Sequence, residues 1–480
     1  MNRRMVLNIV GRMLRLEAAL LLIPAIVSLI YRENEALAFL VTAAGAFLLG
    51  CVLKYVFKPK SPVIYSKEGF IITALVWITM SLVGAVPFII SGEIPNFFDA
   101  FFETVSGFTT TGSSILTDVE KMSHGCLFWR SFTHWVGGMG ILVFVMAIVP
   151  NISDRAIHIM RAEMPGPVIG KIVPRVKDTA KILYLIYLAI TAVEVILLTA
   201  GGMPLFDSII HSFGTAGTGG FGIKADGLAS YSAYSQWVIA IFMMIFGVNF
   251  NLYFFVVIRR IRDVLRSTEL WIYFALISVS TALIAMNIRS MFGSFSETVR
   301  TAFFQVSSII TTTGFATADF NLWPGFSKAI ILLLMFVGGC AGSTAGGLKV
   351  SRAVLLVKQV GREFKKVLRP RSVSAVRFEG KPMDENIVHS VCVYFALYIF
   401  CIAAIFLIVS FEPFGFETNF TATVTCFNNV GPGFALVGPA GNFSAYSALS
   451  KVVLSFAMLL GRLEIFPMLL LFSPSLWKRR

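Results

Sequence analysis

The chain alternates long apolar segments with shorter ones, and the same order returns along its length. An apolar segment of about 20 residues can cross a bilayer as a helix, whereas one of about ten to fifteen cannot. Two long segments come first, one ending near residue 30 and one covering residues 36–57. The further predicted long helices cover residues 69–90, 126–149, 179–200, 236–258, 270–286, 325–360 (interrupted), 388–411 and 449–472. The predicted short helices, which we interpret as re-entrant segments, cover residues 96–108, 204–213, 296–310 and 417–427.

Each short segment leads into a glycine-bearing loop, and the four loops recur about every hundred residues. The third, within residues 309–320, reads IITTTGFATADF. Glycine permits unusual backbone conformations, and small neighbours let carbonyl oxygens face a ligand. The candidate site is therefore the backbone of these loops. Its residues are Thr109, Thr110, Thr111, Gly112, Gly217, Thr218, Gly219, Gly220, Thr311, Thr312, Thr313, Gly314, Asn428, Asn429, Val430 and Gly431.

Composition places these segments in a membrane, because the chain is 56% hydrophobic and only 14% charged, against about 25% charged in a soluble domain. The net charge of +14 is concentrated in residues 155–177, 259–266, 352–381 and 478–480, which alternate with the glycine loops. By the positive-inside rule the basic segments are cytoplasmic and the glycine loops face outside. This predicts ten spans, four re-entrant segments and two cytoplasmic termini. The basic charge is expected to meet anionic lipid rather than nucleic acid.

Irregular backbone at membrane depth is tolerated only where it is buried in protein or lines a water-filled cavity. Four such segments around one axis would form a ring whose carbonyl oxygens replace the hydration shell of a cation. The C-terminal ends of the short helices would add partial negative charge. The alternative is that the loops are four tight helix-packing sites built from small residues.

Six longer motifs carry a resemblance to a known family. They are TTTGSS at 109–114, WRSFTHWVGGMGILV at 129–143, TTTGFATADF at 311–320, GGCAGSTAGGLKVSR at 338–352, NNVGPGF at 428–434 and GRLEIFP at 461–467. Together they resemble the Trk/Ktr potassium-uptake family, the membrane subunits of bacterial potassium uptake systems, over essentially the whole chain. The two N-terminal spans are similar to the Trk branch. His134 departs from the amide residue expected at its position.

The resemblance implies a carbonyl-lined selectivity filter to which each loop supplies one glycine: Gly112, Gly220, Gly314 and Gly431. It also implies K+ as the transported ion with no organic cofactor, a homodimer with one pore per subunit, and a cytosolic nucleotide-binding regulatory ring. The location would be the bacterial inner membrane. In the family a serine in place of the first glycine favours sodium, so Gly112 argues for potassium.

A second glycine-rich segment, GGCAGSTAGG at residues 338–347, interrupts a predicted helix, where each glycine costs about 1 kcal/mol relative to alanine. The resemblance implies an intramembrane gate loop here and an arginine, Arg462, in the pore. Arg462 and Glu464 are two positions apart, so they do not share a helix face. A buried structural ion pair is the alternative for Arg462. The candidate gate residues are Gly338, Gly339, Gly342, Ser343, Thr344, Gly346, Gly347, Lys349 and Arg462.

We divide the chain into five parts: a two-helix extension (1–66) and four repeats (67–165, 166–266, 267–370 and 371–480). Two other functions remain open. A sodium-permeating or sodium-coupled transporter would share the architecture. An integral-membrane enzyme would need a polar catalytic cluster, but the five histidines are dispersed and no hydrolase or zinc motif occurs.

Overall fold

The computed structural model describes residues 2–59, 66–140, 176–371 and 374–474, and these residues are almost entirely helical. Within them, the strands are a single antiparallel pair, β1 (Arg377–Phe378) and β2 (Lys381–Pro382). The predicted all-helical class is confirmed.

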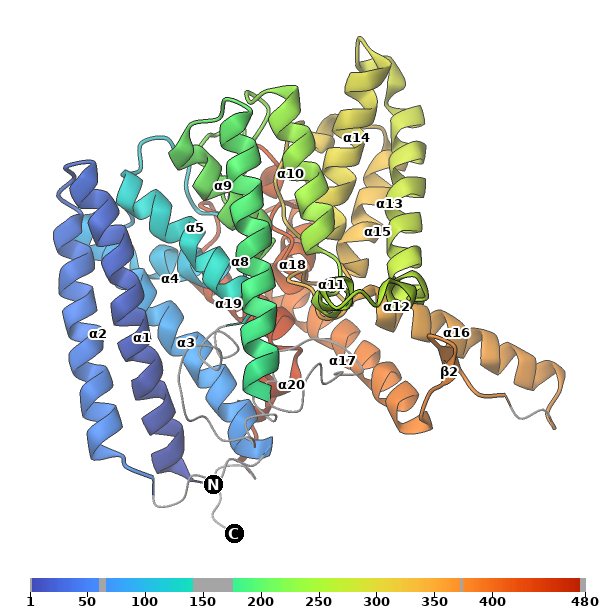
Figure 1. Cartoon of the computed structure of the whole chain (residues 1–480), viewed down its shortest axis with the longest axis horizontal. Helices are drawn as coiled ribbons and strands as arrows, with labels where there is room; N and C mark the ends of the chain where they lie inside the picture. Colours follow the sequence, from blue (N-terminus) through green and yellow to red (C-terminus); the bar gives the residue numbers. More distant parts are fainter. Residues whose placement is uncertain (1, 60–65, 141–175, 372–373, 475–480) are drawn as a thin grey trace.

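The chain begins with a helical hairpin of α1 (Arg3–Ile30) and α2 (Ala36–Val56), which lies beside α3 (Ser66–Ser91) at one edge of the molecule (Figure 1). A Cβ atom at Gly11 would lie 2.8 Å from the carbonyl oxygen of Gly50. The two helices therefore approach closely because glycine removes the side chains between them.

The other helices follow the predicted order of long, short and long. The first set is α3, α4 (Phe97–Phe108) and α5 (His124–Gly138); the second is α8 (Val176–Ala200), α9 (Leu205–Gly217), α10 (Ala233–Phe246) and α11 (Phe250–Val257). The third is α13 (Thr268–Asn287), α14 (Phe295–Ile310), α15 (Gly325–Val337) and α16 (Val350–Leu368); the fourth is α17 (Glu385–Val409), α18 (Phe416–Asn428), α19 (Ala448–Arg462) and α20 (Phe466–Leu471). Short connecting elements are α12 (Ile261–Leu265), η2 (Arg289–Met291), η3 (Phe320–Leu322) and η4 (Ala435–Val437).

Six of the described helices are long and apolar enough to cross a membrane, and a seventh is added if the bent pair α10 and α11 is one span. The prediction was ten spans, and the difference lies in the second long helix of each set. In the first set, the part of the predicted helix beyond residue 140 lies outside the described residues. In the other three sets this helix is broken.

The predicted continuous helix 236–258 is wrong because the chain bends by 92° between α10 and α11. Backbone groups at the bend bond to a distant segment instead of to their own helix. The carbonyl oxygen of Gly247 accepts from the Cys340 N–H at 2.9 Å, and the Phe250 N–H donates to the Gly342 carbonyl at 3.0 Å. The side chain of Asn249 caps α11. These bonds replace the helical ones that the bend removes.

The predicted continuous helix 449–472 is also wrong, because the chain turns between α19 and α20. Glu464 and Ile465 have φ values of +57° and +65°, in the left-handed region. Pro467 lies in the first turn of α20, where its missing N–H costs least. A proline inside a continuous helix would remove a hydrogen bond and clash with the preceding turn.

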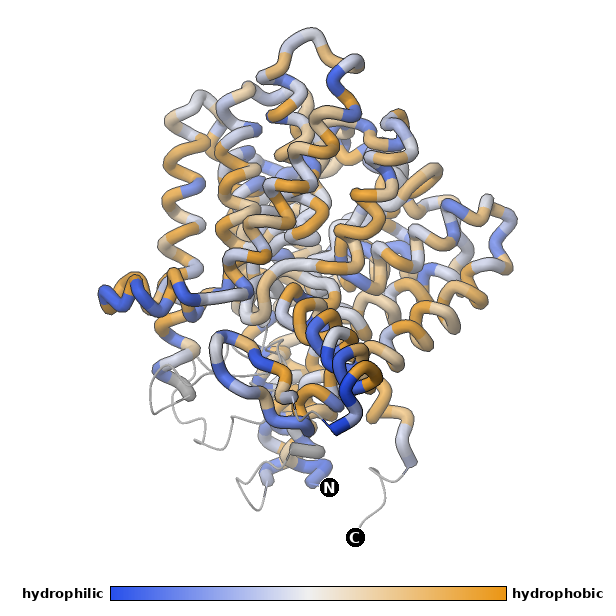
Figure 2. The backbone as a smooth tube through the Cα atoms, turned by 90° about the vertical axis from the view of Figure 1, so that its right-hand side faces the viewer, coloured by the Kyte–Doolittle hydropathy of each residue, from blue (hydrophilic) through white to orange (hydrophobic). Residues whose placement is uncertain are grey.

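The C-terminal parts of the short helices lie in the interior. Residues 102–108 of α4 and 421–428 of α18 are all buried. Figure 2 shows hydrophobic residues along the long helices and strongly hydrophilic segments around the end of the molecule where α1 begins. The irregular backbone that follows each short helix is therefore enclosed by protein, as a membrane location requires.

Candidate functional site

The four glycine loops share one backbone conformation. In each, a residue with left-handed φ stands two positions before a glycine with positive φ. The pairs are Thr110 (+55°) and Gly112 (+81°), Thr218 (+56°) and Gly220 (+75°), Thr312 (+57°) and Gly314 (+85°), and Asn429 (+56°) and Gly431 (+100°). Left-handed conformations are uncommon for residues other than glycine, so four copies at equivalent positions mark one repeated structure.

The loops pack against each other in a closed cycle. A Cβ atom at Gly112 would lie 2.0 Å from the carbonyl oxygen of Gly219, the residue before the glycine of the second loop. The corresponding distances are 2.0 Å from Gly220 to Thr313, 2.3 Å from Gly314 to Val430 and 2.8 Å from Gly431 to Thr111. Each glycine therefore meets the carbonyl of the next loop, and the fourth loop returns to the first. We call this arrangement the loop ring.

Most polar side chains of the loop ring are bonded within the protein. The hydroxyls of Thr109 and Thr111 lie 2.8 Å apart, as do those of Thr311 and Thr313. Thr109 also donates to a carbonyl of its own helix at 2.6 Å. These bonds leave backbone carbonyls as the main oxygen atoms that the first and third loops can offer to a ligand.

In the fourth loop the side chains of two asparagines are likewise bonded within the protein. Tyr398 donates to the side-chain oxygen of Asn428 at 2.7 Å, and the amide of Asn429 donates to Thr111 at 2.9 Å and to the Met458 carbonyl at 3.0 Å. The Asn429 side chain therefore links the fourth loop directly to the first.

The second loop is supported by His134, the residue that departs from the expected amide. Its Nδ1 lies 2.7 Å from the Gly107 carbonyl oxygen, and a Cβ atom at Gly219 would lie 2.3 Å from its ring. The imidazole thus packs directly behind the second loop, and this contact leaves no room for a side chain at Gly219.

On one side the loop ring opens into a cavity of about 170 Å³, which we call the vestibule. Gly112, Gly220, Gly314 and Gly431 all line it. The glycines of the four repeats therefore line one shared space.

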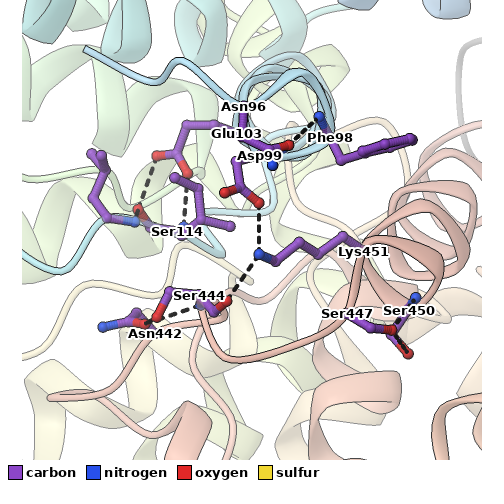
Figure 3. A network of polar contacts seen from close by, with 12 residues as sticks. Asn96, Phe98, Asp99, Glu103, Ser114, Asn442, Ser444, Ser447, Ser450 and Lys451 are labelled. Atoms are coloured by element: carbon purple, nitrogen blue, oxygen red, sulfur yellow. Dashed lines mark hydrogen bonds and ion pairs between the residues drawn. The ribbon is translucent and has the colours of Figure 1, made fainter. Parts of the chain in front are cut away.

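Two ion pairs lie near the vestibule. Glu103 of α4 and Arg130 of α5 form one with a distance of 2.6 Å. Figure 3 shows the Glu103 carboxylate bonded to Ser114, and nearby Asp99 paired with Lys451 of α19 at 2.6 Å. The two pairs tie the first short helix to later parts of the chain.

On the other side, residues 338–349 form a non-helical segment between α15 and α16, which we call the gate loop. The predicted interruption of the helix is therefore present. The N–H of Gly346 donates to the hydroxyl of Thr312 at 2.6 Å, and a Cβ atom at Gly346 would lie 2.4 Å from the Asn428 carbonyl oxygen. The gate loop thus lies directly against the loop ring, across from the vestibule.

Three cations surround the gate loop. Arg462 donates to the carbonyl oxygens of Thr344 at 2.8 Å, Gly137 at 2.6 Å and Gly138 at 2.5 Å. Lys349 donates to the Ala345 carbonyl within the loop. The third cation, Arg352 at the start of α16, forms an ion pair with Glu464. Arg462 therefore joins the loop to the end of α5, and the carboxylate nearest to it in sequence pairs with another arginine.

A carboxylate that no sequence pattern singles out anchors both ends of the gate loop. Glu269, in the first turn of α13, accepts from the N–H groups of Ala341 at 2.7 Å and Ser351 at 3.0 Å, and its side chain is buried. Its sequence signal is weak, because an acidic residue in the first turn of a helix is ordinary. Its partners lie about 70 to 80 residues away, beyond the reach of any local pattern.

Comparison with known proteins decides the family. The model of the TrkH family, described as cation transport protein, matches residues 36–479. The chain belongs to this family. It is 37% identical to the Trk system potassium uptake protein TrkH of Salmonella typhimurium over 100% of both chains, and 32% identical to TrkG of Escherichia coli K12 over 99% of both. It also matches the crystal structure of the potassium transporter TrkH from Vibrio parahaemolyticus, with a TM-score of 0.89, 31% identity and full coverage of both chains.

Membership of the TrkH family confirms the resemblance drawn from the six motifs. The family transports cations, so the chain is a transporter and the enzyme alternative is set aside. The apolar helices and the family together make it a multi-pass membrane protein.

Proposed function

We propose that this chain carries potassium ions across the bacterial inner membrane through the loop ring. The observation that carries the proposal is the closed cycle of contacts, in which each glycine of one loop meets a carbonyl of the next. Relatives of the chain bear the names potassium uptake protein and potassium transporter, which supports this choice of ion.

The proposed mechanism depends on carbonyl oxygens rather than on carboxylates. An ion leaving the vestibule exchanges its hydration shell for carbonyls of the four loops, which suits a large and weakly hydrated cation. The short helices end at the ring, so the partial negative charge of their C-termini favours a cation there. The tight-packing alternative explains the glycines but gives no reason for a vestibule lined by all four.

Growth of a potassium-uptake-deficient bacterium on limiting potassium tests the function. The expected result is that the chain restores growth and K+ influx, while Na+ influx remains much smaller. Absence of K+ influx, with the protein present in the membrane, would contradict the proposal. Equal K+ and Na+ influx would favour the sodium-permeating alternative.

We also propose that the gate loop closes the ring and that Arg462 both clamps it and raises an electrostatic barrier. The clamp is supported by the three carbonyls that this guanidinium joins, from α5 and from the loop. The barrier follows because a positive charge in a low-dielectric path opposes a cation by several kcal/mol, reduced by water in the path.

Two substitutions of Arg462 separate the clamp from the barrier. Arg462→Gln removes the charge and most of the donors, so K+ flux is expected to rise several-fold in proteoliposomes. Arg462→Lys keeps the charge but has one nitrogen in place of the two that bind the loop and α5 separately, so its flux is expected to lie between those of Arg462→Gln and the parent. If both variants assemble normally and flux falls in each, Arg462 has a structural role only.

The proposal includes two assemblies, a homodimer and a complex with a regulatory partner. The apolar stripe of α16, made of Val357, Val360, Phe364, Val367 and Leu368, is 55–80% exposed, and its spacing places it on one helix face. A second copy of the chain is proposed to cover it, giving a homodimer. Phe364→Glu should then shift the purified protein from dimer to monomer in a mass measurement, and an unchanged dimer would exclude this surface.

The basic segment 352–381 is proposed to face the cytoplasm, together with both termini, and to meet a nucleotide-binding regulatory ring and anionic lipid. Its lysines and arginines support this orientation. Pull-down from native membranes tests the partner, and recovery of this chain alone at every nucleotide condition would contradict it.

A further inference from the structure

The vestibule carries an unusual charge for a space that cations must cross. Its lining includes two cationic side chains, Arg130 and Lys224, and no carboxylate among the residues that the structure describes. The charge of Arg130 is balanced by Glu103 at 2.6 Å. Lys224 has no carboxylate within ion-pair distance in the described ranges.

The surroundings hold Lys224 in place without neutralising it. Its Nζ donates to the Ser230 hydroxyl at 3.0 Å and lies 4.4 Å from the centre of the Tyr231 ring. Neither nearby acid forms a direct ion pair with Lys224: Glu120 accepts from the Ala225 N–H at 3.1 Å, and Asp226 accepts at 3.4 Å from the same Ser230 hydroxyl that binds Lys224. Lys224 is therefore held by a hydroxyl and an aromatic ring and not by a carboxylate.

Lys224 is also the one charged residue among the four equivalent positions of the loops. It stands four positions after the ring glycine Gly220, where the other repeats have Leu116, Ala318 and Ala435. Packing at this position therefore does not require a charge. The positive charge of Lys224 is therefore better explained by its effect on ions in the vestibule than by packing.

We propose that Lys224 determines specificity by excluding divalent cations from the vestibule, an inference that rests on the proposed potassium function. One unit charge several ångströms away through water lowers the local concentration of a monovalent cation by roughly threefold. For a divalent cation the electrostatic energy doubles, so the factor is squared to roughly ninefold. The access of K+ to the ring is thus lowered about threefold and that of Mg²⁺ or Ba²⁺ about ninefold.

Proteoliposomes containing the full chain test this with K+ influx and with block by Ba²⁺ added on the vestibule side. At low ionic strength Lys224→Gln is expected to raise K+ influx about threefold and to tighten Ba²⁺ block about ninefold. Both effects should shrink at about 1 M inert salt, where the Debye length is about 3 Å. Lys224→Arg, which keeps the charge, should behave like the parent.

A matched control is Lys121→Gln. Lys121 has a side chain that is 86% exposed, is paired with Asp118 at 2.7 Å and does not line the vestibule, so its loss should change neither quantity. The parent protein gives an independent check, because its K+ influx at fixed low K+ should rise as inert salt is added.

Unchanged Ba²⁺ block in Lys224→Gln at low salt would overturn the inference. So would equal defects in Lys224→Gln and Lys224→Arg, which would show that the lysine only positions its loop. A parent chain that carries no K+ would contradict the proposed function itself, whereas an active parent with an unaffected variant rejects only the role of Lys224.

Discussion

Gly112→Ser is expected to lower the discrimination of K+ over Na+ by about tenfold or more while the protein still reaches the membrane. A Cβ atom there would lie 2.0 Å from the Gly219 carbonyl oxygen, so the second loop must move away from the first. The φ of +81° adds strain of about 1–3 kcal/mol for a residue other than glycine. Ion flux measured with K+ and Na+ in the same preparation checks this result.

Gly92→Ser is the matched control for this substitution. Gly92 belongs to the same repeat and has a φ of +82°, but no atom lies within 4 Å of the position of its Cβ. The control therefore carries the same backbone strain without the contact to a neighbouring loop. If both variants lose selectivity equally, the effect comes from strain and the loop ring does not set the ion preference.

The positions of the four loops could be predicted from sequence because glycine recurrence and apolar segment length are local signals. The predicted short helix 417–427, for example, is α18, Phe416–Asn428. The closed cycle could not be predicted in this way. The contact of Gly431 with the Thr111 carbonyl joins residues about 320 apart in the chain. Neither hydropathy nor the spacing of glycines predicts which loops will be in contact.

The two broken helices show a second limit of sequence patterns. Hydropathy identifies an apolar segment but does not show where its backbone hydrogen bonds go. At Gly247 the helical bond is replaced by one from Cys340 in the gate loop, and at Glu464 the chain turns so that its carboxylate meets Arg352. Both breaks lie beside the gate loop, so the helices that depart from their predicted course adjoin the part of the molecule proposed to move.

Deletion of residues 343–345 is expected to raise K+ flux about tenfold in the absence of any partner, with K+ preference over Na+ unchanged. The deletion removes the Thr344 and Ala345 carbonyls that Arg462 and Lys349 hold. It retains Cys340 and Gly342, whose bonds to Gly247 and Phe250 support the bend between α10 and α11. The loop ring is left intact, so selectivity should persist.

This result would also define how a partner opens the pathway. A partner shifts an equilibrium only by the difference between its affinities for the open and closed arrangements. Because the gate loop continues directly into the basic helix α16, a partner bound there is positioned to favour one arrangement. A chain that is already open has no closed population to shift, so the deletion variant should respond less to its partner than the parent does. If the variant folds, binds its partner and conducts at the parental rate, residues 338–349 are a packing site and the closing element lies elsewhere.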